Sequence, residues 1–260
     1  PSSVDLLNAV KISGRTEKGL GIGFLNAVTE KTYATIWDNE TETSRKEVVE
    51  PLTNYNVLVF DQRFNQNSSV SFVNTNTTRN GSFRDANVSA LLFDLNTKEN
   101  NYNLYGDFKY SQINTLEDYS GYKTSLNFEK TSGRYSYLFS GKYISENYDI
   151  NDLGIIFYTN YHSALANASY RILNTFKVEQ ELNMEVQNTT GKTQEAWYKT
   201  VIKATSLSNH YFEFALVVNP LETFDFYEPL EYGKYVFIPK RIASYVGFES
   251  NRNHAFTFDT

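Results

Sequence analysis

Apolar and polar side chains alternate along several segments of the chain, which predicts β-strands with one apolar and one polar face. The clearest segment is residues 176–187. One of its faces carries Phe176, Val178, Leu182, Met184 and Val186, with Gln180 as its one polar member. The opposite face carries Lys177, Glu179, Glu181, Asn183, Glu185 and Gln187. Residues 102–111, 122–129 and 135–143 alternate in the same way.

The whole chain divides into about fourteen such strands, each about 9–13 residues long and able to cross a bilayer at a tilt. The predicted strands start near Leu6, Leu20, Asn54, Ser68, Ala86, Asn101, Gly121, Arg134, Tyr161, Thr175, Gln194, His210, Arg241 and His254. Tight turns alternate with longer links, which are predicted at residues 30–53, 77–85, 112–120, 146–160, 188–193 and 219–240. Proline is absent from every predicted strand, as hydrogen-bonded strands require.

Short turns on one side and long loops on the other are typical of outer-membrane barrels. We therefore predict an all-β fold, an antiparallel up-and-down transmembrane β-barrel. Its lipid-facing residues include Phe176, Val178, Leu182, Met184 and Val186. Its lumen-facing polar residues include Lys123, Asn127, Glu129, Lys177, Glu179, Glu181, Asn183 and Glu185.

The predicted domain is a single one, residues 1–260. A closed barrel pairs its last strand with its first. The first predicted strand begins almost at once, and the last one runs to Thr260. We therefore expect an incomplete segment of a larger barrel, with an N-terminal domain and C-terminal strands outside it.

Composition agrees with this interpretation. The mean hydropathy of -0.48 is that of an ordinary soluble protein, but a barrel turns only alternate strand residues toward lipid. Twenty Tyr and nineteen Phe against two Trp suit β-structure. The net charge of -6 argues against a nucleic-acid partner. The lack of cysteine excludes a disulfide framework and a cysteine nucleophile.

Three carboxylates on one predicted face, Glu179, Glu181 and Glu185, are candidates for the acid and base of glycoside cleavage. Neighbours on that face lie roughly 7 Å apart along the strand. Charged rows also line barrel interiors, however, and Lys177 and Lys123 offer neutralising partners. The pattern favours lumen lining, so we assign no catalytic residue and predict that the chain is not an enzyme.

A second candidate resembles the start of a calcium-binding loop, with oxygen ligands at alternating positions and a glycine at the sixth. It consists of Asp149, Asn151, Asp152 and Gly154. Leu153 then occupies a ligand position, and Asn160 stands where a bidentate Glu is required. The sequence favours a turn in a long extracellular loop, with a loosely bound cation as the alternative.

The remaining motifs predict no metal site and no cofactor. His162, His210 and His254 are scattered singly and lack metal-binding spacing, so we expect them to pack at strand ends. Gly19, Gly21 and Gly23 spell G-x-G-x-G, but no helix follows them. They are better explained as strand glycines that face a crowded interior.

Several phrases of the sequence resemble an uncharacterised family of Bacteroidota proteins, domain of unknown function 5916. The most specific are LLNAVKISGRTEKGLGIGFLNAVTEKTYAT at residues 6–35 and EPLTNYNVLVFDQRF at residues 50–64. Shorter ones are SSVSFVNTNTTR at 68–79, NDLGIIF at 151–157 and DFYEP at 225–229. In that family a domain similar to carbohydrate-binding module family 9 usually precedes the barrel. The resemblance implies an outer-membrane protein of a Gram-negative bacterium, concerned with surface glycans, and carries over no catalytic residue.

The leading hypothesis is a non-enzymatic outer-membrane barrel that serves as a solute channel or as the membrane anchor of a glycan-binding domain. Its expected partners are membrane lipid and lipopolysaccharide, with other outer-membrane proteins or surface glycans as further candidates. One alternative is an accessory subunit of an outer-membrane secretion or barrel-assembly machine. The other is a soluble all-β carbohydrate-binding or glycoside-cleaving domain.

Overall fold

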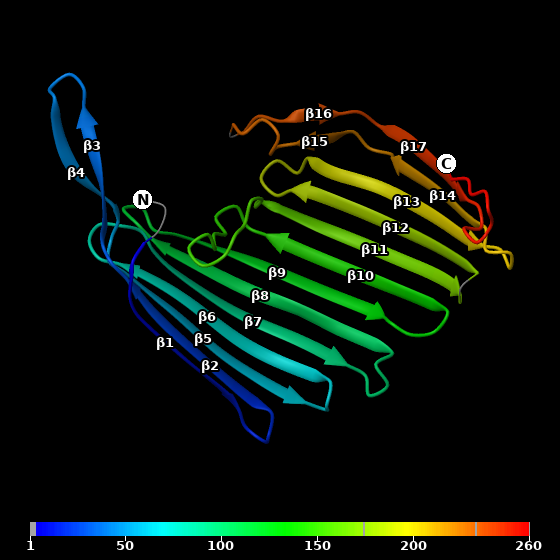
Figure 1. Cartoon of the computed structure of the whole chain (residues 1–260), viewed down its shortest axis with the longest axis horizontal. Coiled ribbons are helices and arrows are strands. Elements are labelled where there is room, and N and C mark those ends of the chain that lie inside the picture. The colour runs from blue at the N-terminus through cyan, green and yellow to red at the C-terminus, as the bar shows by residue number, and fades with distance from the viewer. Residues whose placement is uncertain (1–3, 174, 232, 260) are drawn as a thin grey trace. The chain divides into compact units, whose positions relative to one another are not determined.

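A computed structural model of the protein describes residues 4–173, 175–231 and 233–259 (Figure 1). Every regular element in these ranges is a β-strand. The same ranges include no helix with the length and apolar character that a membrane span requires. The prediction of an all-β, antiparallel, up-and-down fold is confirmed.

Thirteen strands in the described residues form one sheet, in the order β1-β2-β5-β6-β7-β8-β9-β10-β11-β12-β13-β14-β17. Their bounds are β1 Leu6–Arg15, β2 Leu20–Thr29, β5 Thr53–Phe64, β6 Ser68–Arg79, β7 Asp85–Asn96, β8 Tyr102–Asn114, β9 Tyr119–Lys130, β10 Tyr135–Ile144, β11 Tyr161–Ile172, β12 Phe176–Gln187, β13 Thr193–Thr205, β14 Tyr211–Asn219 and β17 Arg241–Glu249. Each of them starts within two residues of a predicted start. The order has two ends, β1 and β17, and no pairing between them is found in the described part of the chain.

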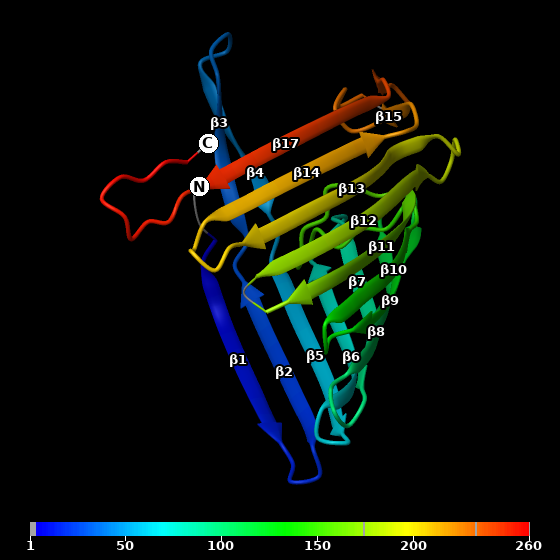
Figure 2. The same ribbon diagram turned by 90° about the vertical axis from the view of Figure 1, so that its right-hand side faces the viewer.

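Two further hairpins lie in links for which no strand was predicted. One pairs β3, Thr32–Asp38, with β4, Thr43–Glu50, and projects beyond the ends of β2 and β5 (Figure 1). The other pairs β15, Thr223–Asp225, with β16, Val236–Ile238, at the end of β13 (Figure 2). The β-branched and aromatic residues Tyr33, Thr35, Ile36 and Trp37 are a strand signal inside the first link.

The predicted strand at His254 is wrong. The chain after β17 turns back on itself, because the N–H of His254 donates to the carbonyl of Asn251 at 3.2 Å. The N–H of Ser250 donates to the carbonyl of Phe258 at 2.7 Å, and the N–H of Phe258 donates to Ser250 Oγ at 2.7 Å. These bonds use backbone groups that a strand would offer to a neighbour.

The predicted alternation of short and long links is correct only in part. Strands β6 and β8 run on to Arg79 and Asn114, so the links that follow them shorten to residues 80–84 and 115–118. Residues 188–192 also form a short link. The extended connections are the two that hold the hairpins and the loop at residues 145–160.

The turn between β5 and β6 is set by local backbone chemistry. Asn65 and Gln66 both have positive φ, 49° and 66°. Two consecutive residues in this region match the twist of the flanking strands, and Asn adopts it at low cost. The predicted turn at residues 65–67 therefore forms where the sequence places it.

The chain divides into two compact units, which we describe separately. The first comprises residues 1–93, 107–123 and 147–159, and the second comprises residues 94–106, 124–146 and 160–260. Buried side chains of the first unit include Ala86, Ile113, Tyr148, Thr77 and Ser111. Those of the second include Ile144, Tyr161, Ala196, Val201 and Thr223.

In both units the apolar face of a strand is more exposed than its polar face. In β8 of the first unit, Phe108 is 47% exposed, whereas Ser111 on the opposite face is 0% exposed. In β12 of the second unit, Leu182 is 54% exposed and Met184 is also exposed, whereas Glu181 and Glu185 are partly buried. Water-soluble sheets show the reverse arrangement.

Candidate functional site

Polar side chains of β12 form hydrogen bonds with neighbours on the same face of the sheet. Lys177 Nζ lies 2.7 Å from Glu179 Oε2. Asn167 Nδ2 on β11 donates to Glu181 Oε2 at 3.0 Å. Asn183 Nδ2 donates to Glu195 Oε2 on β13 at 2.9 Å. Lys177 thus neutralises Glu179, whereas Glu181 and the exposed Glu195 accept hydrogen bonds from neutral amides.

The other residues predicted to line the interior are divided between the units. Lys123 belongs to the first unit, and Asn127 and Glu129 belong to the second. Asn127 Nδ2 donates to the carbonyl of Tyr105 at 3.4 Å. Among the predicted lipid-facing residues, Leu182 and Met184 are exposed, and Phe176, Val178 and Val186 are partly exposed. The assignment of the two faces to lumen and lipid stays a prediction.

One predicted residue, Glu185, lies in a cavity of ≈ 250 Å³ in the second unit. Residues of β12, β13, β14 and β17 and of the β15–β16 hairpin line it, and it is partly open to solvent. Its lining side chains are Glu185, Gln194, Glu195, Trp197, Asn219, Thr223, Asp225, Tyr227, Ile238 and Arg241. Three carboxylates, two aromatic rings and one guanidinium thus share one small space. We call it the acidic cavity.

Strand register brings two of these carboxylates together, because Glu185 on β12 is paired directly with Glu195 on β13. Side chains at such positions have Cβ atoms roughly 5 Å apart. Gln194 Nε2 donates to Glu185 Oε1 at 2.9 Å and to the Tyr227 hydroxyl at 3.3 Å. Burial raises the pKa of Tyr227 to about 12, so its hydroxyl stays protonated at neutral pH.

The hairpin above the cavity is held by its own polar and aromatic contacts. Backbone N–H groups of Tyr227 and Glu228 donate to Asp225 Oδ1 at 2.8 Å and 3.0 Å, which fixes the Asp225 carboxylate. The Lys192 ammonium lies 3.7 Å from the centre of the Tyr235 ring and 4.4 Å from that of Phe224. These cation–π contacts tie the hairpin to the link at residues 188–192.

The acidic loop that resembles a calcium-binding motif lies in the first unit, where arginines bind its carboxylates. Arg79 Nη1 lies 2.7 Å from Asp152 Oδ1, and Arg84 Nη2 lies 2.5 Å from Asp152 Oδ2. Arg84 Nη1 lies 2.9 Å from Asp149 Oδ2. The Asp152 side chain is almost fully buried. The loop carboxylates are thus neutralised by guanidinium groups, and the interpretation as a turn fits better than a bound cation.

Electrostatics and backbone contacts hold this loop in place. Burial alone would raise the pKa of Asp149, but hydrogen bonds from Arg84 and from the Asn151 N–H outweigh it and lower the pKa. The same ion pairs raise the pKa of Arg84. The Asp149 N–H donates to Ser111 Oγ on β8 at 3.1 Å. Across the described ranges no group of three acidic or histidine side chains is placed to hold a metal ion.

The loop also packs closely on β9. Tyr148 is 2% exposed. A Cβ atom added at Gly121 would lie 2.2 Å from the backbone nitrogen of Tyr148, so only glycine leaves room for the loop. Burial raises the pKa of Tyr148 to about 12.

The other motifs have structural roles. His162 Nδ1 lies 2.8 Å from Asn188 Oδ1, and His210 Nδ1 accepts from the Asn251 N–H at 3.1 Å. A Cβ at Gly21 would lie 2.8 Å from Arg15 Nη2. Gly21 thus makes room for the ion pair between Arg15 and Asp61.

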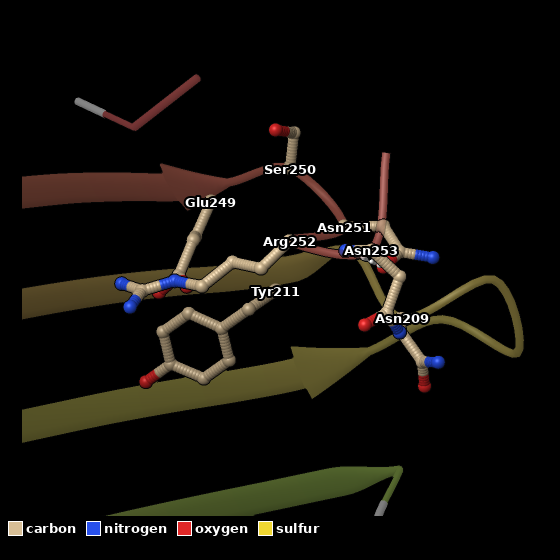
Figure 3. A pocket seen from close by; sticks show the side chains of 7 residues that line it. All are labelled: Asn209, Tyr211, Glu249, Ser250, Asn251, Arg252 and Asn253. Atoms are coloured by element: carbon tan, nitrogen blue, oxygen red, sulfur yellow. Dashed lines mark hydrogen bonds and ion pairs between the residues drawn. The ribbon is translucent and has the colours of Figure 1, made fainter. Parts of the chain in front are cut away.

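A second hollow lies beside the end of β17 and is lined by residues of the turn before β14, the first residue of β14, the last residue of β17 and the turn that follows it (Figure 3). Its lining residues are Asn209, Tyr211, Glu249, Ser250, Asn251, Arg252 and Asn253. Arg252 is ion-paired with Glu249, and Asn251 Nδ2 donates to the carbonyl of Ser208 at 2.8 Å. These contacts hold the turns together, so we assign the hollow a structural role.

Sequence reasoning found Glu185 but missed the rest of the acidic cavity. Gln194 and Trp197 on β13 and Asp225 on β15 come from two segments that only the fold brings to Glu185 on β12. Trp197, one of two tryptophans, was a weak signal in the sequence. Arg84 and Asp152 are 68 residues apart in the chain, and no spacing rule connects them.

The model of one protein family matches residues 1–260, the full sequence. Its description reads Domain of unknown function (DUF5916). No curated protein and no solved structure matches the chain. The family match confirms the resemblance drawn from the sequence phrases. The chain therefore belongs to the DUF5916 family of proteins, whose function is not known.

Proposed function

We propose that this chain is a membrane-spanning part of an outer-membrane β-barrel protein of a Gram-negative bacterium. In this proposal the apolar strand faces contact lipid and the polar faces line the interior. The protein acts without catalysis, as a solute channel or as the membrane anchor of a glycan-binding domain.

The observation that carries this proposal is the inverted exposure of the strand faces. Rows of exposed apolar side chains, such as Leu126 and Phe128 on β9 or Leu182 and Met184 on β12, are costly in water. The opposite faces carry partly buried side chains that hydrogen-bond to one another, as Asn167 does with Glu181. Lipid on one side and an enclosed polar interior on the other make this arrangement favourable.

Strand length adds support. The shortest strands of the large sheet, β14 and β17, have 9 residues, and the longest, β8 and β13, have 13. A tilted transmembrane strand needs about 9–11 residues. In lipid every backbone N–H and C=O must be paired, so the proposal requires partners for the edges of β1 and β17, as in a closed barrel.

Two adjacent substitutions test the face assignment. Leu182→Arg places a charge on the proposed lipid face. We expect it to reduce the free energy of unfolding of the protein in lipid vesicles by ~2–4 kcal/mol near mid-bilayer. Asn183→Arg, on the opposite face, is expected to be tolerated because Glu195 lies within hydrogen-bond distance of residue 183. Urea titration of vesicle-folded protein measures both. Equal tolerance of the two changes would refute the face assignment.

Conductance separates the two roles. The complete barrel protein, inserted in a planar lipid bilayer, conducts ions if its interior is open to both sides, and an anchor with a filled interior does not.

A further inference from the structure

Aromatic side chains gather at one end of the exposed strand faces in the second unit. Each of them lies within two residues of a strand end that adjoins a short turn. They are Tyr102, Phe128, Tyr135, Tyr170, Phe176, Phe212 and Phe248, on β8, β9, β10, β11, β12, β14 and β17. We call this group the aromatic belt. Its side chains are exposed or partly exposed, and Tyr135 reaches 65% exposure.

Strand register sets part of the belt in one row. Phe176 on β12 is paired with Ala204 on β13, and Ala204 is paired in turn with Phe212 on β14. Phe212 is paired with Phe248 on β17. Residues that are paired across antiparallel strands point to the same face of a sheet. The three rings therefore lie in one line on one face.

Ring contacts continue the belt over the neighbouring strands. Tyr135 on β10 is paired with Tyr170 on β11, and the centres of their rings lie 4.7 Å apart. The centre of the Phe128 ring lies 6.1 Å from that of Tyr102 and 6.0 Å from that of Tyr137. The rings thus form contacts from strand to strand rather than standing singly.

The belt separates apolar surface from polar surface. Toward the middle of the strands, the row next to Phe176 consists of Val178, Ile202, Phe214 and Val246. On its other side, the turns at residues 131–134, 206–210 and 250–253 are mostly Ser, Thr, Asn, Gly and Arg. Aromatic rings between an apolar and a polar zone are typical of a strand that crosses the boundary between lipid and water.

The opposite ends of the same faces differ from the belt. There the side chains on the exposed face of β12, β14 and β17 are Val186, Val218 and Ile242. Tyr143 and His162 form a ring pair at that end, with centres 6.4 Å apart. Packing within a sheet gives no reason for rings to gather at one end of the strands, whereas a membrane boundary at that end does.

We propose that the aromatic belt contacts the boundary between the hydrocarbon and the headgroups of a lipid leaflet, with the short turns beyond it in water. This inference rests on the proposed function and adds to it the end of the strands at which the hydrocarbon stops. The tyrosine hydroxyls reach the headgroups, and the rings contact the acyl chains. Because the short turns of outer-membrane barrels face the periplasm, this leaflet is the periplasmic one.

Nitroxide labels test the depth of the belt, because the chain contains no cysteine and one introduced cysteine can be labelled alone. The full chain is folded into phosphatidylcholine vesicles with a label at Phe176→Cys, Leu182→Cys or Asn183→Cys. Collisions with molecular oxygen, which concentrates in hydrocarbon, and with a water-soluble nickel chelate report the surroundings of each label. Residue 183 is the matched control, since it lies beside Leu182 on the opposite face of β12.

We expect the ratio of oxygen collisions to nickel collisions to be several-fold higher at residue 182 than at residue 176, and lowest at residue 183. The corresponding labels on β14 are Leu216→Cys for the middle of the strand, Phe212→Cys for the belt and Ala215→Cys for the opposite face. They should give the same order, and they serve if a β12 variant folds poorly.

The outcomes distinguish this inference from the proposed function. Equal ratios at residues 176 and 182 would place the belt deep in the hydrocarbon, which overturns the inference and leaves the lipid-facing assignment intact. Shielding of residues 176 and 212 from both reagents would mean that protein covers the belt, which also overturns it. Equal ratios at residues 182 and 183 would refute the face assignment of the proposed function, and the belt inference with it.

Discussion

At the scale of single residues, the groups that pair with an acidic side chain determine whether it can bind a cation. The carboxylates of Asp149 and Asp152 follow one another at a spacing that resembles a cation-binding loop. In the folded chain they are bound by Arg79 and Arg84. A buried charge is stable only when it is paired, and removing one partner of such a pair is costly. The two arginines therefore hold the acidic loop to the end of β6 and to the link at residues 80–84.

A pH dependence follows from Asp149. Its pKa is lowered in the folded protein, so its ion pair stabilises the loop above the ordinary carboxyl pKa and is lost as the pH falls through the folded value. We expect hydrogen-exchange protection of the amides at residues 147–153 to fall in acid, after correction for intrinsic exchange rates. In Asp149→Asn this protection should already be lower at neutral pH, and the further fall of protection in acid, which we call the acid step, should be smaller.

The control for this experiment is Asp118→Asn. Asp118 Oδ1 accepts a hydrogen bond from the Thr115 N–H within the link at residues 115–118, and its carboxylate is not among the ion pairs of Arg79 and Arg84. Its variant should keep the parent pH profile for residues 147–153. An unchanged acid step in Asp149→Asn would show that other groups hold the loop.

At the scale of elements, alternation and turn chemistry fix the strands, and close backbone approach fixes the loop. Thirteen strands start near their predicted positions because alternation and turn residues are local signals. The β3–β4 hairpin lies in a predicted long link, because its β-branched and aromatic residues do not alternate with polar ones and the alternation signal is weak there. The packing of the 145–160 loop on β9 depends on Gly121, which lies far from the loop in sequence.

Gly121→Ala tests that packing. The added Cβ would lie 2.2 Å from the Tyr148 backbone nitrogen, so the loop or the strand must shift. We expect a loss of roughly 1–3 kcal/mol in the free energy of unfolding, the usual cost of overpacking. Urea-induced unfolding measures it.

Gly141→Ala is the matched control, because an added Cβ at Gly141 on β10 meets no atom within 4 Å. We expect this change to be neutral or slightly stabilising, since Ala suits a strand no less than Gly. The same loss of stability in both variants would mean that the loop contact contributes nothing specific.

At the scale of the whole molecule, the exposed apolar side chains lead to an expectation about the behaviour of the protein in solution. Exposed side chains such as Ile12, Phe60, Leu126, Leu182 and Ile242 recur on strands of both units. Large exposed apolar surfaces favour association in water unless lipid or detergent covers them. Composition alone concealed this feature, because the mean hydropathy of -0.48 averages over both faces.

We therefore expect the folded chain to stay monodisperse only in detergent or lipid and to aggregate when detergent is removed. Size-exclusion chromatography with light scattering measures this. A monodisperse protein in plain buffer would favour the soluble all-β alternative. Copurification of intact neighbours from native membranes under mild detergent would instead favour the accessory-subunit alternative.

The sequence by itself determined the strand class, most strand positions, the sorting of side chains into two faces and membership of the DUF5916 family. These properties depend on side-chain alternation, turn residues and family phrases, which are all local in the chain. Only the tertiary structure decided that Glu185 faces Glu195 beneath the β15–β16 hairpin, and that Arg84 binds Asp152. Strand register and loop packing place these residues together, and both depend on contacts between segments far apart in sequence.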